Sequence, residues 1–129
     1  MELYTHARVP WTANEIQDRV RLDTLCDLCP SIEELLSLDP QLERGEFFTV
    51  WGEFQVQREI LIKGVRFTFP GCIHSLQWTV TSHHYEENQI LVHLTASHRE
   101  LPDLVRESFD VFVEQWREGL EVAAAAGDS

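Results

Sequence analysis

The chain has 129 residues, of which 22 are acidic and 10 are basic, so its formal net charge at neutral pH is −12. A chain of this length forms one hydrophobic core and has no room for a second domain. The acidity excludes nucleic acid and anionic membrane surfaces as expected partners, because both are bound mainly through Lys and Arg.

The first third of the sequence predicts one strand and two helices. Alternating apolar residues over 2–9 indicate a short strand. The sequence Thr12-Ala13-Asn14-Glu15 has the pattern of a capping box and predicts a helix over 13–29, which Pro30 stops. A second such pattern, Ser31-Ile32-Glu33-Glu34, predicts another short helix that ends at Asp39-Pro40.

From residue 46 the apolar residues recur at every second position, which is the period of a half-buried strand. Turn residues interrupt this pattern and divide it into about five antiparallel strands. The side chains expected to face the core are mostly large: Phe48, Val50, Phe54, Val56, Phe67, Phe69, Trp78 and Ile90. Gly52 is expected to mark a bulge or a tight turn within the first of these runs.

The last element is predicted to be a long helix. Pro102 suits its first turn, and an apolar stripe follows at helical spacing, made of Val105, Phe109, Phe112, Trp116 and Leu120. We expect residues 1–122 to form a single α+β domain and residues 123–129 to be a flexible tail.

This order of elements resembles the helix-grip fold of the START and Bet v1-like superfamily. In that fold a curved antiparallel sheet wraps around the C-terminal helix. Four stretches carry part of the resemblance, namely Val9-Pro10-Trp11-Thr12, Leu76-Gln77-Trp78, residues 98–102 and residues 115–120. The resemblance implies a cavity between the sheet and the last helix that takes an apolar ligand.

The candidate ligand-binding residues face this implied cavity, and they are Phe67, Phe69, His74, Trp78, Phe109, Phe112 and Trp116. Ligand sites combine apolar walls with a few polar groups. Because nearly all of these side chains are large and apolar, the alternative is that they fill the space and form an ordinary core.

Cysteine and histidine residues give two further candidate sites. Cys26-Asp27-Leu28-Cys29 has the spacing of a metal or redox motif, but both thiols fall on the apolar stripe of the first predicted helix and indicate a buried structural pair. If the strands around Trp78 and Val92 pair their inward residues, His98 lies opposite Cys72 or His74.

Cys72, His74 and His98 are therefore candidate catalytic residues, as a Cys–His nucleophile or a metal site. The sequence offers no evident carboxylate at the right position to orient the imidazole. No motif of an enzyme class is present, so we expect no cofactor and no bound metal.

The negative charge is concentrated at the two ends of the chain. Residues 1–46 contain ten acidic and four basic residues, residues 99–129 contain eight and three, and residues 47–98 contain four and three. On the last helix six carboxylates are expected along one solvent-facing stripe, made of Asp103, Glu107, Asp110, Glu114, Glu118 and Glu121. This stripe is either a solvated face or a docking surface for a basic protein partner.

The outward face of the predicted sheet is mostly uncharged, and interfaces are depleted in charge. We therefore expect a second subunit, in a homodimer, or another partner to cover this face around Trp51. The candidate interface residues are Trp51, Gln55, Gln77, Thr79, Leu91 and His93.

The sequence indicates a cytoplasmic location. The first ten residues contain neither a basic leader nor an apolar stretch, so we expect no secretory signal. The three cysteines, an odd number, fit a reducing compartment better than a disulfide framework.

Three functions remain open at this point. The first is a non-enzymatic binding domain for an apolar small molecule or a protein partner. The second is a small acidic regulatory or assembly protein, resembling a chaperone, inhibitor or immunity factor, that acts through its surface. The third is an enzyme that uses Cys72, His74 and His98.

Overall fold

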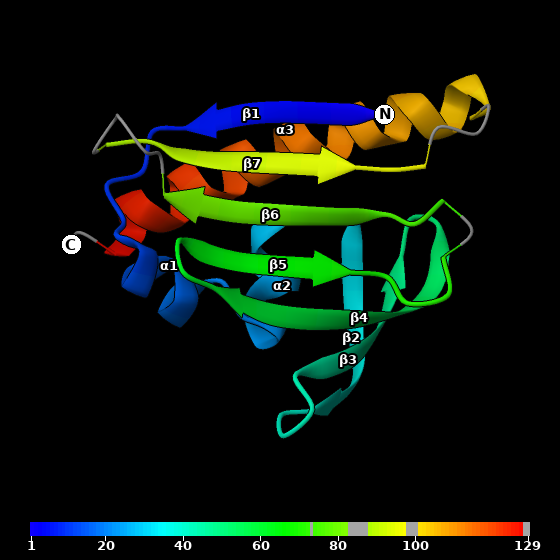
Figure 1. The fold of residues 1–129 in the computed structure, drawn as a ribbon, viewed down its shortest axis with the longest axis horizontal. Coiled ribbons are helices and arrows are strands. Elements are labelled where there is room, and N and C mark those ends of the chain that lie inside the picture. The colour runs from blue at the N-terminus through cyan, green and yellow to red at the C-terminus, as the bar shows by residue number, and fades with distance from the viewer. Residues whose placement is uncertain (73, 83–87, 98–100, 128–129) are drawn as a thin grey trace.

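A computed structural model describes residues 1–72, 74–82, 88–97 and 101–127. Its centre is one seven-stranded antiparallel sheet with the order β1-β7-β6-β5-β4-β3-β2 (Figure 1). The strands are β1 (Glu2–Ala7), β2 (Ile32–Asp39), β3 (Arg44–Thr49), β4 (Gly52–Leu61), β5 (Gly64–Thr68), β6 (Gln77–Ser82) and β7 (Ile90–Thr95). The sheet therefore has seven strands, where the sequence indicates about five.

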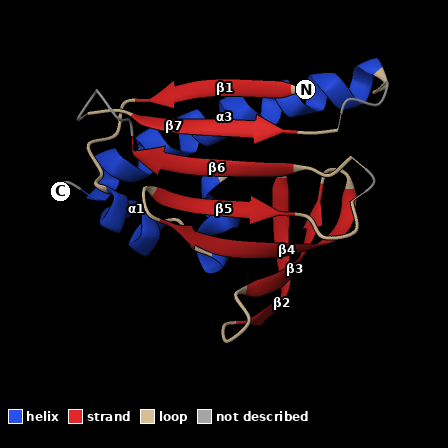
Figure 2. Ribbon diagram, in the orientation of Figure 1, coloured by secondary structure: helices blue, strands red, loops and turns tan. Residues whose placement is uncertain are grey.

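The helices lie together on one side of this sheet (Figure 2). They are α1 (Ala13–Arg19), the short 3₁₀ helix η1 (Leu22–Thr24), α2 (Leu25–Leu28) and the long α3 (Asp103–Gly127). The predicted α+β class, with a C-terminal helix packed on the sheet, is confirmed. The predicted start of the first helix is also correct, because Thr12 and Glu15 form the reciprocal hydrogen bonds of a capping box.

The predicted helix over 31–39 is wrong, because this segment is strand β2. Two hydrogen bonds draw Ser31 to α3: its backbone N–H donates to Gln115 Oε1 over 3.0 Å, and its hydroxyl donates to the same oxygen. Ile32 is fully buried, and β2 pairs with β3 in a ladder that contains two register shifts. Long-range pairing and burial thus override a local capping pattern that supports only a short helix.

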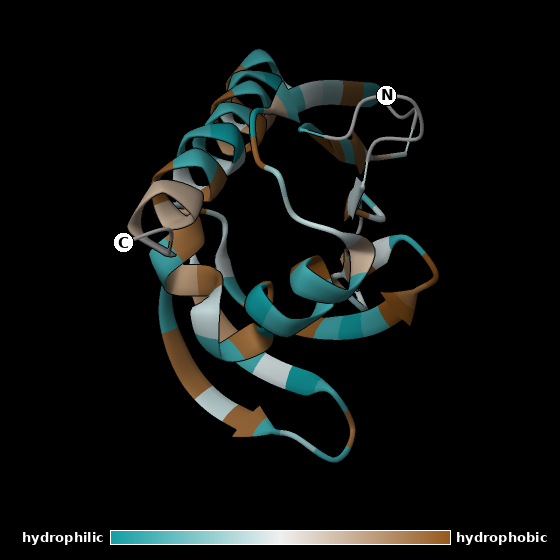
Figure 3. Cartoon of the chain, turned by 90° about the vertical axis from the view of Figure 1, so that its left-hand side faces the viewer, coloured by the Kyte–Doolittle hydropathy of each residue, from teal (hydrophilic) through white to brown (hydrophobic). Residues whose placement is uncertain are grey.

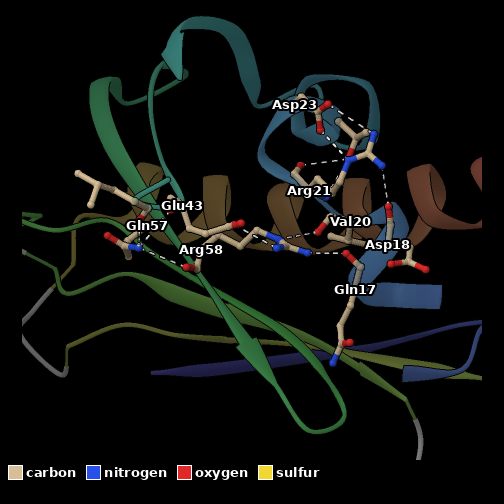
Figure 4. Close-up of polar contacts among 10 residues, drawn as sticks. Gln17, Asp18, Val20, Arg21, Asp23, Glu43, Gln57 and Arg58 are labelled. Carbon is tan, nitrogen blue, oxygen red and sulfur yellow. Dashed lines mark hydrogen bonds and ion pairs between the residues drawn. The ribbon is translucent and has the colours of Figure 1, made fainter. Parts of the chain in front are cut away.

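The predicted helix over 13–29 is interrupted after Arg19, and a buried arginine explains the break. Arg58 of β4 donates from Nε to the Val20 carbonyl over 3.1 Å and from Nη2 to the Gln17 carbonyl (Figure 4). Its Nη1 pairs with Glu43 at 3.1 Å. Arg58 thus satisfies carbonyl groups that the end of α1 leaves without a helical partner, and the chain turns there into η1.

A tight turn after β3 is accompanied by a change in which side chains of this strand face the core. Thr49 pairs with Gly52 across a turn formed by Val50 and Trp51, and Gly52 has a φ of 114°, which favours glycine. The prediction that Phe48 and Val50 face the core is therefore wrong, since they are 43% and 50% exposed. Phe47 and Thr49 face the core instead.

The core lies between α3 and the sheet, and Figure 3 shows hydrophobic segments on both. The predicted stripe on α3 is confirmed, with Phe109, Phe112, Trp116 and Leu120 buried and Val105 half-buried. The helix extends beyond the expected end at residue 122 and runs to Gly127, with Ala124 buried.

Helix α3 approaches α2 closely at Gly119. A Cβ atom at this position would lie 1.9 Å from the Leu28 carbonyl oxygen, far inside van der Waals contact. Only glycine therefore fits here without moving one of the two helices.

We expect Arg58→Met to lower the free energy of unfolding by about 3 kcal/mol, because the buried carbonyl groups and Glu43 lose their partner. Urea denaturation measures the change. The control is Arg66→Met, which breaks a more exposed pair with Glu59 and is expected to cost less than about 1 kcal/mol. If the two variants lose the same free energy of unfolding, the result contradicts the capping role of Arg58.

We expect Gly119→Ala to lower the free energy of unfolding by about 2 kcal/mol, since the added methyl group overlaps the Leu28 carbonyl. At a helical position without this contact, the same substitution raises stability by up to about 1 kcal/mol. The sign of the change in a urea denaturation experiment therefore tests the close contact.

Candidate functional site

A cavity of about 400 Å³ lies at the end of the fold where α3 begins. Its walls come from the turn between β3 and β4, the start of β4, the segment that joins β5 to β6, and the first turns of α3. The lining residues are Trp51, Phe54, Phe69, Gly71, Cys72, His74, Leu76, Val105 and Phe109.

Aromatic side chains form most of the wall and hold one another in place. The Trp51 ring meets Phe69 and Phe109 edge-on, with ring centroids 6.1 and 5.5 Å apart. Phe54 stacks on Phe69 with centroids 5.1 Å apart. The Trp51 indole N–H donates to the Ser108 hydroxyl over 2.8 Å, so the tryptophan links the β3–β4 turn to α3.

The polar end of the cavity lies in the compact segment between β5 and β6. This segment is closed by backbone hydrogen bonds from Cys72 to Phe69 and from Ser75 to Cys72. The carbonyl of His74 accepts a 2.7 Å hydrogen bond from the Ser97 N–H, which continues the contact between β6 and β7. The His74 Nδ1 atom is buried and has no hydrogen-bond partner.

Known proteins resemble the chain in structure rather than in sequence. No family model matches the chain, and no curated protein matches it. The protein XoxI from Bacillus cereus superposes with a TM-score of 0.70 at 13% identity, covering 99% of this chain and 98% of that one. A START superfamily protein from Mycobacterium smegmatis superposes with a TM-score of 0.66 at 10% identity, covering 98% and 97%.

A third solved structure, Ara h 8.0201, has a TM-score of 0.60 at 11% identity and covers 98% of both chains. The chain has a START/Bet v1-like helix-grip fold. The resemblance suggested by the order of the elements is thereby confirmed at the level of the fold.

Three of the seven predicted ligand-binding residues, Phe69, His74 and Phe109, line the cavity of this helix-grip fold. The other four, Phe67, Trp78, Phe112 and Trp116, are completely buried and pack together in the core, where Trp78 and Phe112 meet with ring centroids 4.9 Å apart. Their role in binding a ligand stays a prediction.

The cavity is also lined by residues that the sequence does not mark as ligand-binding, namely Trp51, Phe54, Gly71, Leu76 and Val105. The period of two over residues 48–57 places Trp51 on the outward face of the sheet, although Gly52 is expected to mark a bulge or a tight turn in the same run. That placement is wrong, since the Trp51 ring lies against α3. The register of such a hairpin depends on its turn, and Gly52 after Trp51 was the available signal.

Cys72 and His74, two of the three candidate catalytic residues, line the same cavity. The third, His98, lies outside the described residues. In the part of the chain that the structure describes, no group of three His, Cys, Asp or Glu side chains is arranged to hold a metal ion.

The remaining candidate interface residues lie away from the cavity. Gln77, Thr79, Leu91 and His93 are half-buried on the sheet face that points away from α3, and Gln55 is exposed. On that face the His93 ring stacks on Tyr4 from β1, with centroids 4.2 Å apart. A role for these residues in an interface or a homodimer stays a prediction.

The acidic stripe on α3 faces solvent as predicted, with Glu121 half-buried and the other five residues exposed. Arg117 offsets part of its charge, because it pairs with Glu114 and, at 3.0 Å, with Glu121. The hydrogen bond from Arg117 lowers the pKa of Glu114 below its usual value. Across the described residues, no helix is long and apolar enough to cross a membrane.

The Cys26–Cys29 motif does not form a disulfide, and both thiols are free. Cys29 is completely buried, and its Sγ atom lies 3.5 Å from Gln115 Oε1. Burial raises the pKa of the Cys29 thiol to about 12. Burial also raises the pKa of Cys26, which is half-buried. The Cys29 thiol is therefore a poor nucleophile at neutral pH.

We expect Cys29 to resist iodoacetamide at pH 8 in the folded protein and to react quickly in 8 M urea. The raised pKa keeps the thiol protonated, and burial blocks access to it. Peptide mapping by mass spectrometry after timed labelling measures this at each cysteine. Rapid labelling of Cys29 in the folded protein would contradict its structural role.

Proposed function

We propose that the protein binds an apolar small molecule in the cavity at the start of α3. The observation that carries the proposal is an open volume of about 400 Å³, within the range of roughly 300–1,000 Å³ that is typical of ligand sites. The large core residues fill the centre of the fold, so this volume is a separate feature at one end of it.

The composition of the wall supports an apolar ligand. Four aromatic side chains, Trp51, Phe54, Phe69 and Phe109, face the volume together with Leu76 and Val105. Contacts with such rings favour ring-containing ligands by about 1 kcal/mol for each well-placed pair, in addition to the burial of apolar surface. Because Ser108 accepts the Trp51 N–H, the indole adds no unsatisfied polar group to this wall.

Binding is better supported than catalysis. Cys72 and His74 share the cavity, but a Cys–His nucleophile normally needs a group that orients the imidazole. Nδ1 of His74 has no such partner, and among the described lining residues there is no carboxylate. An enzyme using Cys72, His74 and His98 stays an alternative, as does an acidic protein that acts through the α3 surface.

We expect Val105→Trp to reduce binding of the neutral fluorescent probe N-phenyl-1-naphthylamine at least about tenfold. Val105 lines the cavity, and an indole at this position occupies much of the open volume. The measurement is titration of the probe with excitation outside the tryptophan band. Dissociation constants are compared with those of the unmodified protein.

The matched control is Val111→Trp on the same helix, because Val111 is 52% exposed and does not belong to the cavity lining. This variant is expected to bind the probe like the unmodified protein. Lack of saturable binding to the unmodified protein, or an equal loss in both variants, would contradict the proposed function.

A further inference from the structure

Few of the side chains that line the cavity can form hydrogen bonds. Among the described lining residues only Trp51, Cys72 and His74 have polar atoms in their side chains. The Trp51 N–H is already bound to Ser108, and a thiol is a weak donor and acceptor. His74 is therefore the one strong hydrogen-bonding side chain available to a ligand within the described lining.

The two nitrogen atoms of His74 are not equivalent. Nδ1 is buried, makes no hydrogen bond and is out of reach of a ligand. The ring as a whole is half-buried and lines the cavity, which leaves Nε2 as the nitrogen that a ligand can approach. Depending on the tautomer, Nε2 of a neutral imidazole either donates or accepts a hydrogen bond.

A hydroxyl group is the ligand group that matches this nitrogen. It donates and accepts, so it pairs with either tautomer of His74, whereas a carbonyl group pairs with only one. An anionic group suits the site poorly, because no basic Lys or Arg lines the cavity among the described residues and the protein is strongly acidic. Moving a carboxylate from water into such a site is costly.

The aromatic walls of the cavity determine which apolar skeleton of a ligand fits. Phe54 and Phe69 stack with their planes 14° apart, and the Trp51 ring meets Phe69 edge-on. Flat rings make the largest contact with walls of this kind.

We propose that the cavity selects an uncharged, flat ring compound with a hydroxyl group that hydrogen-bonds to Nε2 of His74. This inference rests on the proposed function and adds the chemical class of the ligand and the residue that recognises its polar group.

The test uses four probes of similar shape: naphthalene, 2-methylnaphthalene, 2-naphthol and 2-naphthoate. Each displaces N-phenyl-1-naphthylamine from the full-length protein. We expect 2-naphthol to bind about fivefold more tightly than 2-methylnaphthalene, which is the effect of one neutral hydrogen bond. We expect 2-naphthoate to bind at least about tenfold more weakly than 2-naphthol.

The variant His74→Leu is expected to abolish the preference for 2-naphthol over 2-methylnaphthalene, whatever its effect on the affinity for naphthalene. His74→Gln retains a hydrogen-bonding group and is expected to restore part of the preference. The control His93→Leu replaces a histidine on the opposite face of the sheet and is expected to change none of the four affinities. The probe series on the unmodified protein gives a result even if a His74 variant does not fold.

The outcomes separate the two proposals. If the naphthalene probes bind but 2-naphthol shows no preference, or its preference survives in His74→Leu, the role of His74 is overturned and the proposed function stands. If 2-naphthoate binds more tightly than 2-naphthol, the proposal that the ligand is uncharged is overturned. If none of the probes binds, the proposed function fails and this inference fails with it.

Discussion

The close contact between Gly119 and the Leu28 carbonyl is the constraint that holds α3 against α2. A short distance away Gln115 accepts hydrogen bonds from Ser31, so the C-terminal half of the helix is fixed both to α2 and to the start of β2. The first turns of α3, from Asp103, lie at the other end of the helix. There the helix is linked to the sheet side through Trp51 and Ser108, and the cavity lies beside that link. The cavity thus lies beside the start of the helix, away from its close contact with α2.

Parts of the fold that depend on local signals could be predicted from the sequence. The capping box at Thr12, the apolar stripe of α3 and the pairing of Trp78 with an inward residue of β7 are encoded by neighbouring residues or by simple periodicity. The capping pattern at Ser31 is equally strong locally, yet it gives a strand, because pairing with β3 and the contact with Gln115 outweigh the stability of a two-turn helix. Likewise the break after α1 depends on Arg58, which is distant in sequence and therefore invisible to a local pattern.

The site was predictable only where its residues belong to regular elements. The positions of Phe69 and Phe109 could be predicted from the periods of the strand and the helix. The position of His74 could be predicted from the expected pairing of β6 and β7. Trp51 could not be placed in the same way, because it belongs to the two-residue turn that reverses the chain between β3 and β4. Loop and turn conformations depend on backbone geometry more than on hydrophobic pattern, and the cavity is lined largely from such segments.

Strand β2 forms one margin of the sheet, and its irregularity has a consequence for self-association. An open strand presents unpaired N–H and C=O groups to which another chain can add, especially where side chains such as Leu36 and Leu38 are exposed. The two register shifts in β2 distort the regular spacing of these groups, and the exposed acids Glu33, Glu34 and Asp39 place like charges where two copies would meet. The protein thus keeps an apolar strand at its margin while disfavouring the strand-by-strand growth that leads to aggregation.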